Sequence, residues 1–352
     1  MQFTINGLHI LGIATVVPRR ITHISDMGDV FGSADIERII NSSGVQSIRS
    51  VDEKICASDL CIQASEHLLS KICVDRTTID AVIFVSQTPD YRLPATSALM
   101  QQRLGLRNDV LAFDINYGCS GYIYGLVQAA MLLSATTCNK VLVCAGDTIT
   151  KLIHPKDRSA KVLFGDAGSA TIIERGYENW PFHFYTDGSG EKHLFVPAGG
   201  SRIPYHSNTC IEFTDEEGNI RTQNNLYMNG MEIMNFALKY VPLSVEGVLV
   251  ESKLNKEDIN AFIFHQANKL MLDFLIKKMK LPKDSAPIAL QNTGNTGPAS
   301  IPLAISIKWR ELSEKTSLQK TLFCGFGVGL STASTIVDLS KTLILGPCEY
   351  GS

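Results

Sequence analysis

Cys119 is the side chain whose type and surroundings most clearly suggest chemistry. It lies in the stretch LAFDINYGCSGYIYGLVQAAMLLS, in which residues 111–115 read as a short buried strand and residues from 120 onward as an apolar helix. Unpaired N–H groups and the dipole at a helix start stabilise a thiolate, the form that can accept an acyl group. On this segment alone two interpretations stand: a nucleophile, or a small buried core cysteine.

Three other segments carry polar residues or glycines directly after an apolar strand pattern. Residues 261–264 lead into His265 and Asn268, residues 287–290 lead into QNTGNTG with Asn295, and residues 322–324 lead into GFGVG with Phe326. In parallel sheets, functional side chains gather at the carboxyl ends of the strands. We therefore expect His265 and Asn295 to meet Cys119 if the segments that carry them pack face to face.

An internal duplication supports that packing. TTIDAVIFVSQ, around Asp80, matches KEDINAFIFHQ, around Asn260, and the same offset of about 180 residues pairs KVLVC with KTLFC. It also places Cys119 opposite Ala299. Strands and helices alternate in each copy, so we predict an α/β fold with two pseudo-symmetric halves, residues 1–175 and 176–352, and mostly parallel sheets.

Composition excludes several classes of protein. The chain has 352 residues, 45% of them hydrophobic, and a net charge of −3, which gives no indication of a nucleic-acid or membrane partner. The N-terminal MQFTINGLHILGIATVVPRR lacks a basic leader and reads as a first strand, and we expect no segment to cross a bilayer. Nine cysteines without regular spacing indicate reduced thiols in a cytoplasmic protein.

The three motifs together resemble those of the β-ketoacyl-acyl carrier protein synthase III family, within the thiolase superfamily. GCSG at Cys119, HQAN at His265 and GNTGPASIPLA at Asn295 are similar to its active-site motifs, and FGDAGSATII is similar to its glycine-rich strand turn. The resemblance runs in order over residues 8–338. It implies a thiolase-like fold whose two halves form five layers, α-β-α-β-α.

The resemblance also implies a reaction. Cys119 would take the acyl group of a thioester, with the backbone N–H groups of Cys119 and Phe326 as an oxyanion hole. His265 and Asn295 would then donate hydrogen bonds to a malonyl thioester as carbon dioxide leaves, and the resulting enolate would attack the acyl group. A condensation without decarboxylation would use a second cysteine as base, and Cys324 keeps that alternative open.

Departures from the family pattern bear on the substrate. The tryptophan and arginine that hold the adenine of coenzyme A in the family are replaced by Arg38 and Ser42, whereas Arg158 matches an arginine near the phosphates of coenzyme A. Arg38 could still stack on a base. A coenzyme A donor and an acyl carrier protein donor both stay open. No further cofactor is implied.

Two more departures concern the acyl pocket. Leu93 stands where the family has a phenylalanine that reaches into the partner's pocket in a homodimer, and Cys324 is aligned with a phenylalanine beside the active site. Both changes would leave more room near Cys119. Together with a longer segment at residues 201–223, they predict a specialised paralogue with an acyl group of its own. Asn268 is expected to orient the loop that lines the substrate site rather than to react.

Lys277 and Lys278 match a basic helix that docks acyl carrier protein in the family. The ordinary interpretation of such lysines is a solvated helix face, and both interpretations stand. His183, His193, His206 and Cys210 have irregular spacing, so we expect no metal site.

Three classes of function remain from the sequence. They are a decarboxylating condensing enzyme, an acyltransferase that passes the acyl group to a hydroxyl or amine, and a non-catalytic subunit of a heterodimer. The second tends to change the asparagine and the third tends to lose one of the three active-site residues, so the first is favoured.

Overall fold

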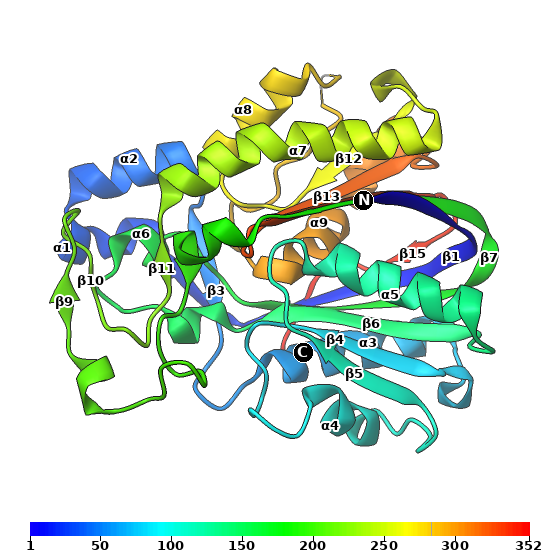
Figure 1. The fold of residues 1–352 in the computed structure, drawn as a ribbon, viewed down its shortest axis with the longest axis horizontal. Helices are drawn as coiled ribbons and strands as arrows, with labels where there is room; N and C mark the ends of the chain where they lie inside the picture. The colour runs from blue at the N-terminus through cyan, green and yellow to red at the C-terminus, as the bar shows by residue number, and fades with distance from the viewer. Residues whose placement is uncertain (283) are drawn as a thin grey trace.

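The computed structural model, which describes residues 1–282 and 284–352, has five layers (Figure 1). From top to bottom in that view they are α7 (Gly230–Ser252) and α8 (Lys269–Met279); strands β12 (Ala261–Phe264), β13 (Thr321–Gly327) and β14 (Ser331–Val337); the central helices α5 (Gly121–Ala135) and α9 (Ser300–Lys315); strands β4 (Ala81–Val85), β5 (Leu111–Ile115) and β6 (Lys140–Asp147); and α3 (Ala57–Ile72) and α4 (Thr96–Arg103). The predicted α-β-α-β-α arrangement is confirmed.

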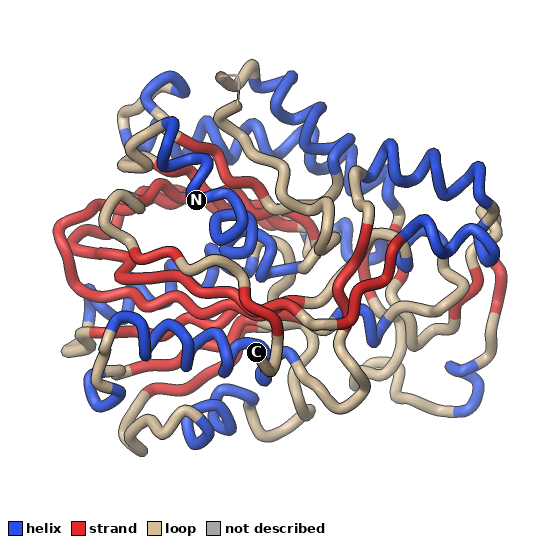
Figure 2. Tube along the Cα trace, turned by 180° about the vertical axis from the view of Figure 1, so that it is seen from behind, coloured by secondary structure: helices blue, strands red, loops and turns tan. Residues whose placement is uncertain are grey.

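Two long antiparallel strands, β1 (Gln2–Val17) and β7 (Ala167–Thr186), join the two strand layers into one sheet of ten strands. The start of β7 pairs with β6 and its end pairs with β14. From behind, the strands form a continuous band between the helices (Figure 2). The predicted boundary at residues 175 and 176 lies inside β7, at a register shift against β1, so the two halves share both strands.

The prediction of mostly parallel sheets was wrong in one respect. The pairs β4–β5, β4–β6 and β12–β13 are parallel, but β6–β7, β13–β14, β14–β7 and β1–β7 are antiparallel. A short turn joins β13 to β14 without a helical crossover, and such a connection produces an antiparallel pair. The sheet is therefore mixed.

The duplication is visible in the strand register. Ala81 pairs with Val141 in one half, and Ala261 pairs with Thr321 in the other. At the same structural position, Asp80 accepts hydrogen bonds from the backbone of residues 139 and 140, and Asn260 accepts one from the backbone of Lys320. The two halves therefore repeat the same local construction.

The large apolar clusters of the core lie in three places. One lies between the two strand layers, and one lies on the outer side of each layer. The central cluster surrounds α5, whose apolar residues extend all round the helix because it contacts both strand layers. The outer clusters lie under α7 and α8 and under α3 and α4.

Helix α7 bears on the expectation that no segment crosses a bilayer. By length and composition alone it could cross a membrane. Its side chains Phe236, Val241, Val245 and Val248 are buried, and they belong to the apolar cluster that covers the sheet. The apolar character of α7 is thus explained by core packing.

The remaining elements cover the left side of Figure 1 and the C-terminal end of the chain. They are β2 (Arg20–His23), α1 (Gly28–Phe31), α2 (Ser33–Ser43), β3 (Ser47–Ser50), α6 (Arg158–Lys161), β8 (Leu194–Phe195), β9 (Phe213–Thr214), β10 (Ile220–Arg221), β11 (Tyr227–Met228), β15 (Leu343–Ile344) and β16 (Cys348–Glu349). The predicted longer segment, 201–223, contains the β9–β10 hairpin.

Candidate active site

Cys119 lies between β5 and α5, immediately before Ser120, the N-cap residue of α5. Its side chain is buried. The turn that follows β13 packs directly against it, and a Cβ atom added at Gly327 would lie 2.7 Å from the Cys119 sulfur. Only glycine permits that approach, with φ +150° at this position. The expected place of Cys119 at the start of a buried helix is confirmed.

The protonation state of Cys119 differs from the prediction. Burial raises the pKa of the thiol to about 11, while hydrogen bonds from the backbone of Val328 and of Cys119 itself act in the opposite direction. The burial cost of a charged sulfur therefore outweighs the stabilisation at the helix start. In this environment the Cys119 side chain is a thiol at physiological pH, and not the thiolate that the sequence predicted.

His265 follows β12 and is buried. Its Nδ1 lies 2.7 Å from the Ser300 hydroxyl at the start of α9. Burial lowers the pKa of His265 to about 3, and a contact with the Gly297 backbone opposes this only weakly. The ring is therefore neutral at physiological pH, a state in which it can donate one hydrogen bond but carries no charge.

Asn295 is held by its own backbone and by its side-chain oxygen. Its N–H donates to the Leu163 carbonyl at 2.9 Å, and its carbonyl accepts from the Gly165 N–H at 3.0 Å. The side-chain Oδ1 accepts from the Gly297 N–H at 3.1 Å. Because Oδ1 is engaged, the Nδ2 group is the part of the amide that remains to donate.

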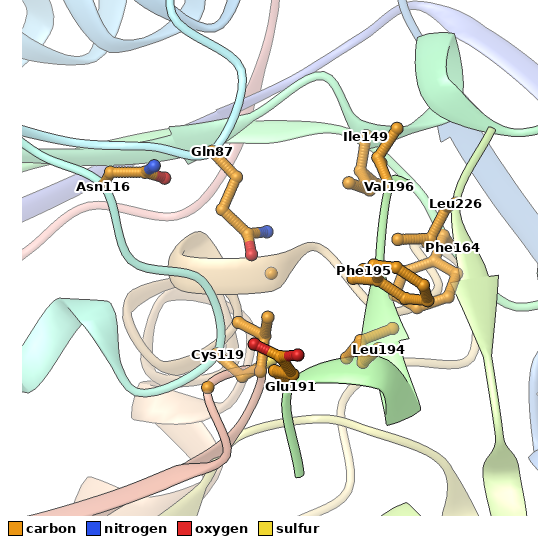
Figure 3. Close-up of a pocket in the computed structure, with 13 residues that line it drawn as sticks. Gln87, Asn116, Cys119, Ile149, Phe164, Glu191, Leu194, Phe195, Val196 and Leu226 are labelled. Carbon is orange, nitrogen blue, oxygen red and sulfur yellow. The ribbon is translucent and has the colours of Figure 1, made fainter. Parts of the chain in front are cut away.

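Three connected cavities surround these residues. A small central cavity is lined by Cys119, His265, Asn295 and Phe326. It shares Cys119, Phe164 and Leu194 with an inner cavity of about 310 Å³ (Figure 3). It also shares Leu163, Met228 and Asn268 with an outer groove of about 270 Å³ that runs between α2, α6 and α8. The structure thus brings the three predicted residues together at the junction of an inner and an outer cavity.

The glycine-rich turn corrects two assignments. Phe326 lies in β13 opposite Thr332, with its ring edge-on to the His265 ring at 5.5 Å, whereas the backbone of Val328 in the turn is the one that contacts the Cys119 sulfur. Val328 therefore replaces Phe326 as the candidate N–H donor beside Cys119. Phe326 is also the aromatic residue at the active site, the place that the sequence comparison gave to Cys324.

Cys324 is fully buried in β13, where it pairs with Phe264 and Ser334. Cys324 is not among the residues that line the three cavities. Burial raises the pKa of its thiol to about 12. Its predicted contact with substrate and the alternative role of second base both lack support, because the residue is fully buried and lines none of these cavities.

The predicted binding residues near the outer groove separate into two groups. Arg158 and Asn268 line the groove, and the Asn268 side chain also caps α8 by accepting from the Met271 N–H at 2.8 Å. Arg38 does not line it; its side chain is 79% exposed and pairs with Asp35, which also pairs with Arg158.

Leu93, Lys277 and Lys278 lie outside the cavities. Leu93 is 81% exposed, in the loop before α4. Lys277 and Lys278 are exposed at the C-terminal end of α8, about 14 Å along the helix from Asn268 at its start. No group of three or more His, Cys, Asp or Glu side chains able to hold a metal ion occurs among the residues that the structure describes.

Several residues that line the cavities or contact the predicted site residues were missed by the sequence interpretation. Ser300 could have been suspected, because it lies within the GNTGPAS motif beside Asn295. The others line the inner cavity and come from separate loops that no local pattern connects: Gln87, Asn116, Ile149, Phe164, Glu191, Leu194, Phe195, Val196, Leu226 and Val328.

Comparison with known proteins agrees with this geometry. The family described as 3-oxoacyl-[acyl-carrier-protein (ACP)] synthase III matches residues 113–188, and its C-terminal counterpart matches residues 249–339. A β-ketoacyl-[acyl-carrier-protein] synthase III from Caldanaerobacter subterraneus is 35% identical, over 94% of this chain and 98% of the relative. The chain belongs to the β-ketoacyl-acyl carrier protein synthase III family.

Solved structures of family members have the same fold. A 3-oxoacyl-(acyl-carrier protein) synthase from Burkholderia xenovorans matches with a TM-score of 0.91 and 37% identity, over 99% of both chains. The priming β-ketosynthase from the R1128 polyketide biosynthetic pathway matches with a TM-score of 0.82 and 26% identity, over 95% of this chain and 97% of the other. The chain is thus similar also to a synthase that is named for polyketide biosynthesis.

Proposed function

We propose that the protein is a decarboxylating condensing enzyme that extends an acyl group held on Cys119. The observation that carries this proposal is the central cavity, where Cys119, His265 and Asn295 line one space. Family membership supports it.

In the first half-reaction, the Cys119 sulfur attacks the carbonyl carbon of an acyl thioester. The thiol proton leaves with the departing thiol, and a thioester to Cys119 remains. The backbone N–H groups of Cys119 and Val328 stabilise the tetrahedral oxyanion, a role in which each donor contributes strongly because the site is buried.

In the second half-reaction, a malonyl thioester enters through the outer groove. His265 and Asn295 donate hydrogen bonds to its thioester carbonyl, the bond to the carboxylate breaks, and carbon dioxide leaves an enolate. The enolate carbon attacks the acyl carbonyl, the bond to Cys119 breaks, and the sulfur takes up one proton from solvent. The Ser300 hydroxyl, 2.7 Å from Nδ1 of His265, would have to donate to that nitrogen, because the mechanism needs the ring proton on Nε2, the nitrogen that faces the substrate.

The reaction needs no further cofactor, because both thioesters are already activated. The test is intact-mass measurement after exposure to acyl thioesters, combined with carbon dioxide release from malonyl thioester. Cys119→Ala should gain no mass. His265→Ala and Asn295→Ala should still be acylated, but carbon dioxide release should fall by about 10²–10³-fold. Acylation without any carbon dioxide release in the wild type would favour transfer to another acceptor, and no acylation would favour a non-catalytic subunit.

The proposal includes acyl carrier protein as a binding partner, because the names of the relatives contain that protein. Lys277 and Lys278 would bind its acidic surface, and Arg158 would bind the phosphate of the carrier's prosthetic group or of coenzyme A. Lys277→Glu with Lys278→Glu should raise KM for the carrier thioester and not for a coenzyme A thioester. Lys71→Glu, on α3 at the opposite side of the molecule, is the control.

The proposal also includes a homodimer in the cytoplasm. Leu93 is apolar and 81% exposed in the single chain, as expected for a residue that reaches into a partner. All nine cysteines are free, as expected in a reducing compartment. Sedimentation at micromolar concentration tests the dimer, and a monomer there would contradict it.

A further inference from the structure

The inner cavity combines an apolar wall with a few polar side chains. Its lining is mostly Ile149, Phe164, Leu194 to Val196 and Leu226, but Gln87, Asn116 and Glu191 also line it (Figure 3). A plain acyl chain that filled this cavity would cover these three groups and take them out of water without offering a hydrogen-bond partner, which costs free energy.

The orientation of the Gln87 amide is fixed by Asp147. The Gln87 backbone N–H donates to Asp147 at 2.7 Å, and its side-chain Nε2 donates to the same carboxylate at 3.0 Å. Asp147 is fully buried and accepts further hydrogen bonds from the hydroxyls of Ser86 and Thr88. With Nε2 directed at this carboxylate, the Oε1 atom must point the other way.

The Gln87 oxygen faces the cavity next to Cys119. It packs over Gly118, where an added Cβ atom would come within 2.4 Å of Oε1. Figure 3 shows the side chain reaching toward Cys119 with its oxygen on that side. Among the described residues, no donor forms a hydrogen bond to Oε1. It is therefore an acceptor held in place for a group that enters the cavity.

Glu191 adds a second acceptor to the same cavity. It lies in the short 3-10 helix Gly188–His193, and its side chain is exposed at the cavity rather than buried in the core. A carboxylate can only accept hydrogen bonds when ionised, and Asn116 can donate as well as accept. Gln87 and Glu191 thus give the cavity an excess of acceptors within an apolar wall.

We infer that the acyl group held on Cys119 carries a hydrogen-bond donor, a hydroxyl or an amino group, on an otherwise apolar chain. This inference rests on the proposed function, since it names the substrate class of that same site. A hydroxyl near the thioester end would donate to Gln87 Oε1, whereas a plain chain of the same length would leave that oxygen without a partner.

The experiment compares rates of Cys119 acylation, followed by intact mass, for matched coenzyme A thioesters. They are butyryl, 3-hydroxybutyryl, 4-hydroxybutyryl, 4-aminobutyryl and the methoxy analogues of the two hydroxyacyl groups. At least one donor-bearing thioester should exceed butyryl by about tenfold in kcat/KM, as expected for one hydrogen bond in a buried site. Its methoxy analogue, which has no donor, should show no gain.

Gln87→Met provides the structural test, because methionine keeps the length of the side chain and removes the acceptor. In this variant the kcat/KM values for the donor-bearing thioester and for butyryl should be about equal. The control is Gln102→Met, on the exposed face of α4, in which the preference for the donor-bearing thioester should persist. A preference for hydroxyl lost in Gln87→Met, or a preference for the amine lost in Glu191→Gln, supports the inference and identifies the donor.

Two other outcomes would overturn it. If butyryl is the best substrate of the wild type, the inference fails whether or not the variants fold, while acylation and carbon dioxide release still uphold the proposed function. If a donor-bearing thioester is preferred but Gln87→Met and Glu191→Gln both keep that preference, the assignment to these acceptors is wrong. Absence of acylation by every thioester would instead reject the proposed function.

Discussion

The neutral state of His265 makes a quantitative prediction about acid stability. Burial lowers the pKa of His265 to about 3, from an ordinary value of 6.5. Below pH 6.5 the unfolded chain binds a proton at this residue and the folded chain does not. The stabilising contribution is therefore complete above pH 6.5 and is lost as the pH falls toward 3.

The magnitude follows from the size of that shift. Between pH 7.5 and pH 5.0, His265 alone should lower the free energy of unfolding by about 2 kcal/mol, and by pH 3 the loss should approach about 5 kcal/mol. This contribution to the unfolding free energy needs no reduction for screening by solvent, because the His265 side chain is 1% exposed. His265→Gln removes the titrating group and keeps a polar side chain, so this part of the pH dependence should disappear.

The assay is urea unfolding of wild type and His265→Gln at pH 7.5 and pH 5.0, at one fixed protein concentration. The decrease in unfolding free energy between the two pH values should be about 2 kcal/mol larger in the wild type. His23→Gln, at an exposed histidine, is the control and should behave as wild type. Equal decreases in wild type and His265→Gln would refute the reasoning that a neutral, buried ring donates in the reaction.

Three further predictions concern other parts of the molecule. Alkylation of Cys119 by iodoacetamide, followed by mass, should accelerate about tenfold per pH unit between pH 7 and pH 9, because its pKa is about 11; a plateau in that range would contradict this. Leu93→Phe should shorten the longest acyl chain accepted on Cys119 and leave the shortest unaffected, and an unchanged length profile would count against the proposed dimer contact. Arg221→Met should lower the unfolding free energy by about 3–5 kcal/mol, because it removes the cation that lies 3.3 Å from the buried Asp157 carboxylate. The control is Arg202→Met, at an exposed arginine, and an equal loss in both variants would disprove the importance of the Arg221–Asp157 pair.

The sequence by itself determined the layered fold and the three motifs of the site. The duplication around Asp80 and Asn260 is a local pattern repeated along the chain, so it can be read without coordinates. Cys119 and His265 each come after a predicted strand that the structure contains, whereas the strand predicted at residues 287–290, before Asn295, is irregular in the structure. These predictions needed only periodicity, turn chemistry and the resemblance of short motifs.

The tertiary structure decided what depends on neighbours from distant segments. The pKa of Cys119 is set by burial under the turn that contains Val328, more than 200 residues away in the chain. The sheet is mixed because β7 pairs antiparallel with strands of both halves and because a short turn joins β13 to β14, and Cys324 is fully buried in β13.

Gln87 shows most clearly why the orientation of a side chain depends on the tertiary structure. Its direction is fixed by Asp147, from a different strand end, and by Gly118, from the loop before Cys119. Desolvation and hydrogen bonding act over a few ångströms in space, whatever the separation along the chain. A sequence pattern can therefore place a reactive side chain on its element, but only the packed structure sets its proton, its orientation and the groups that face it.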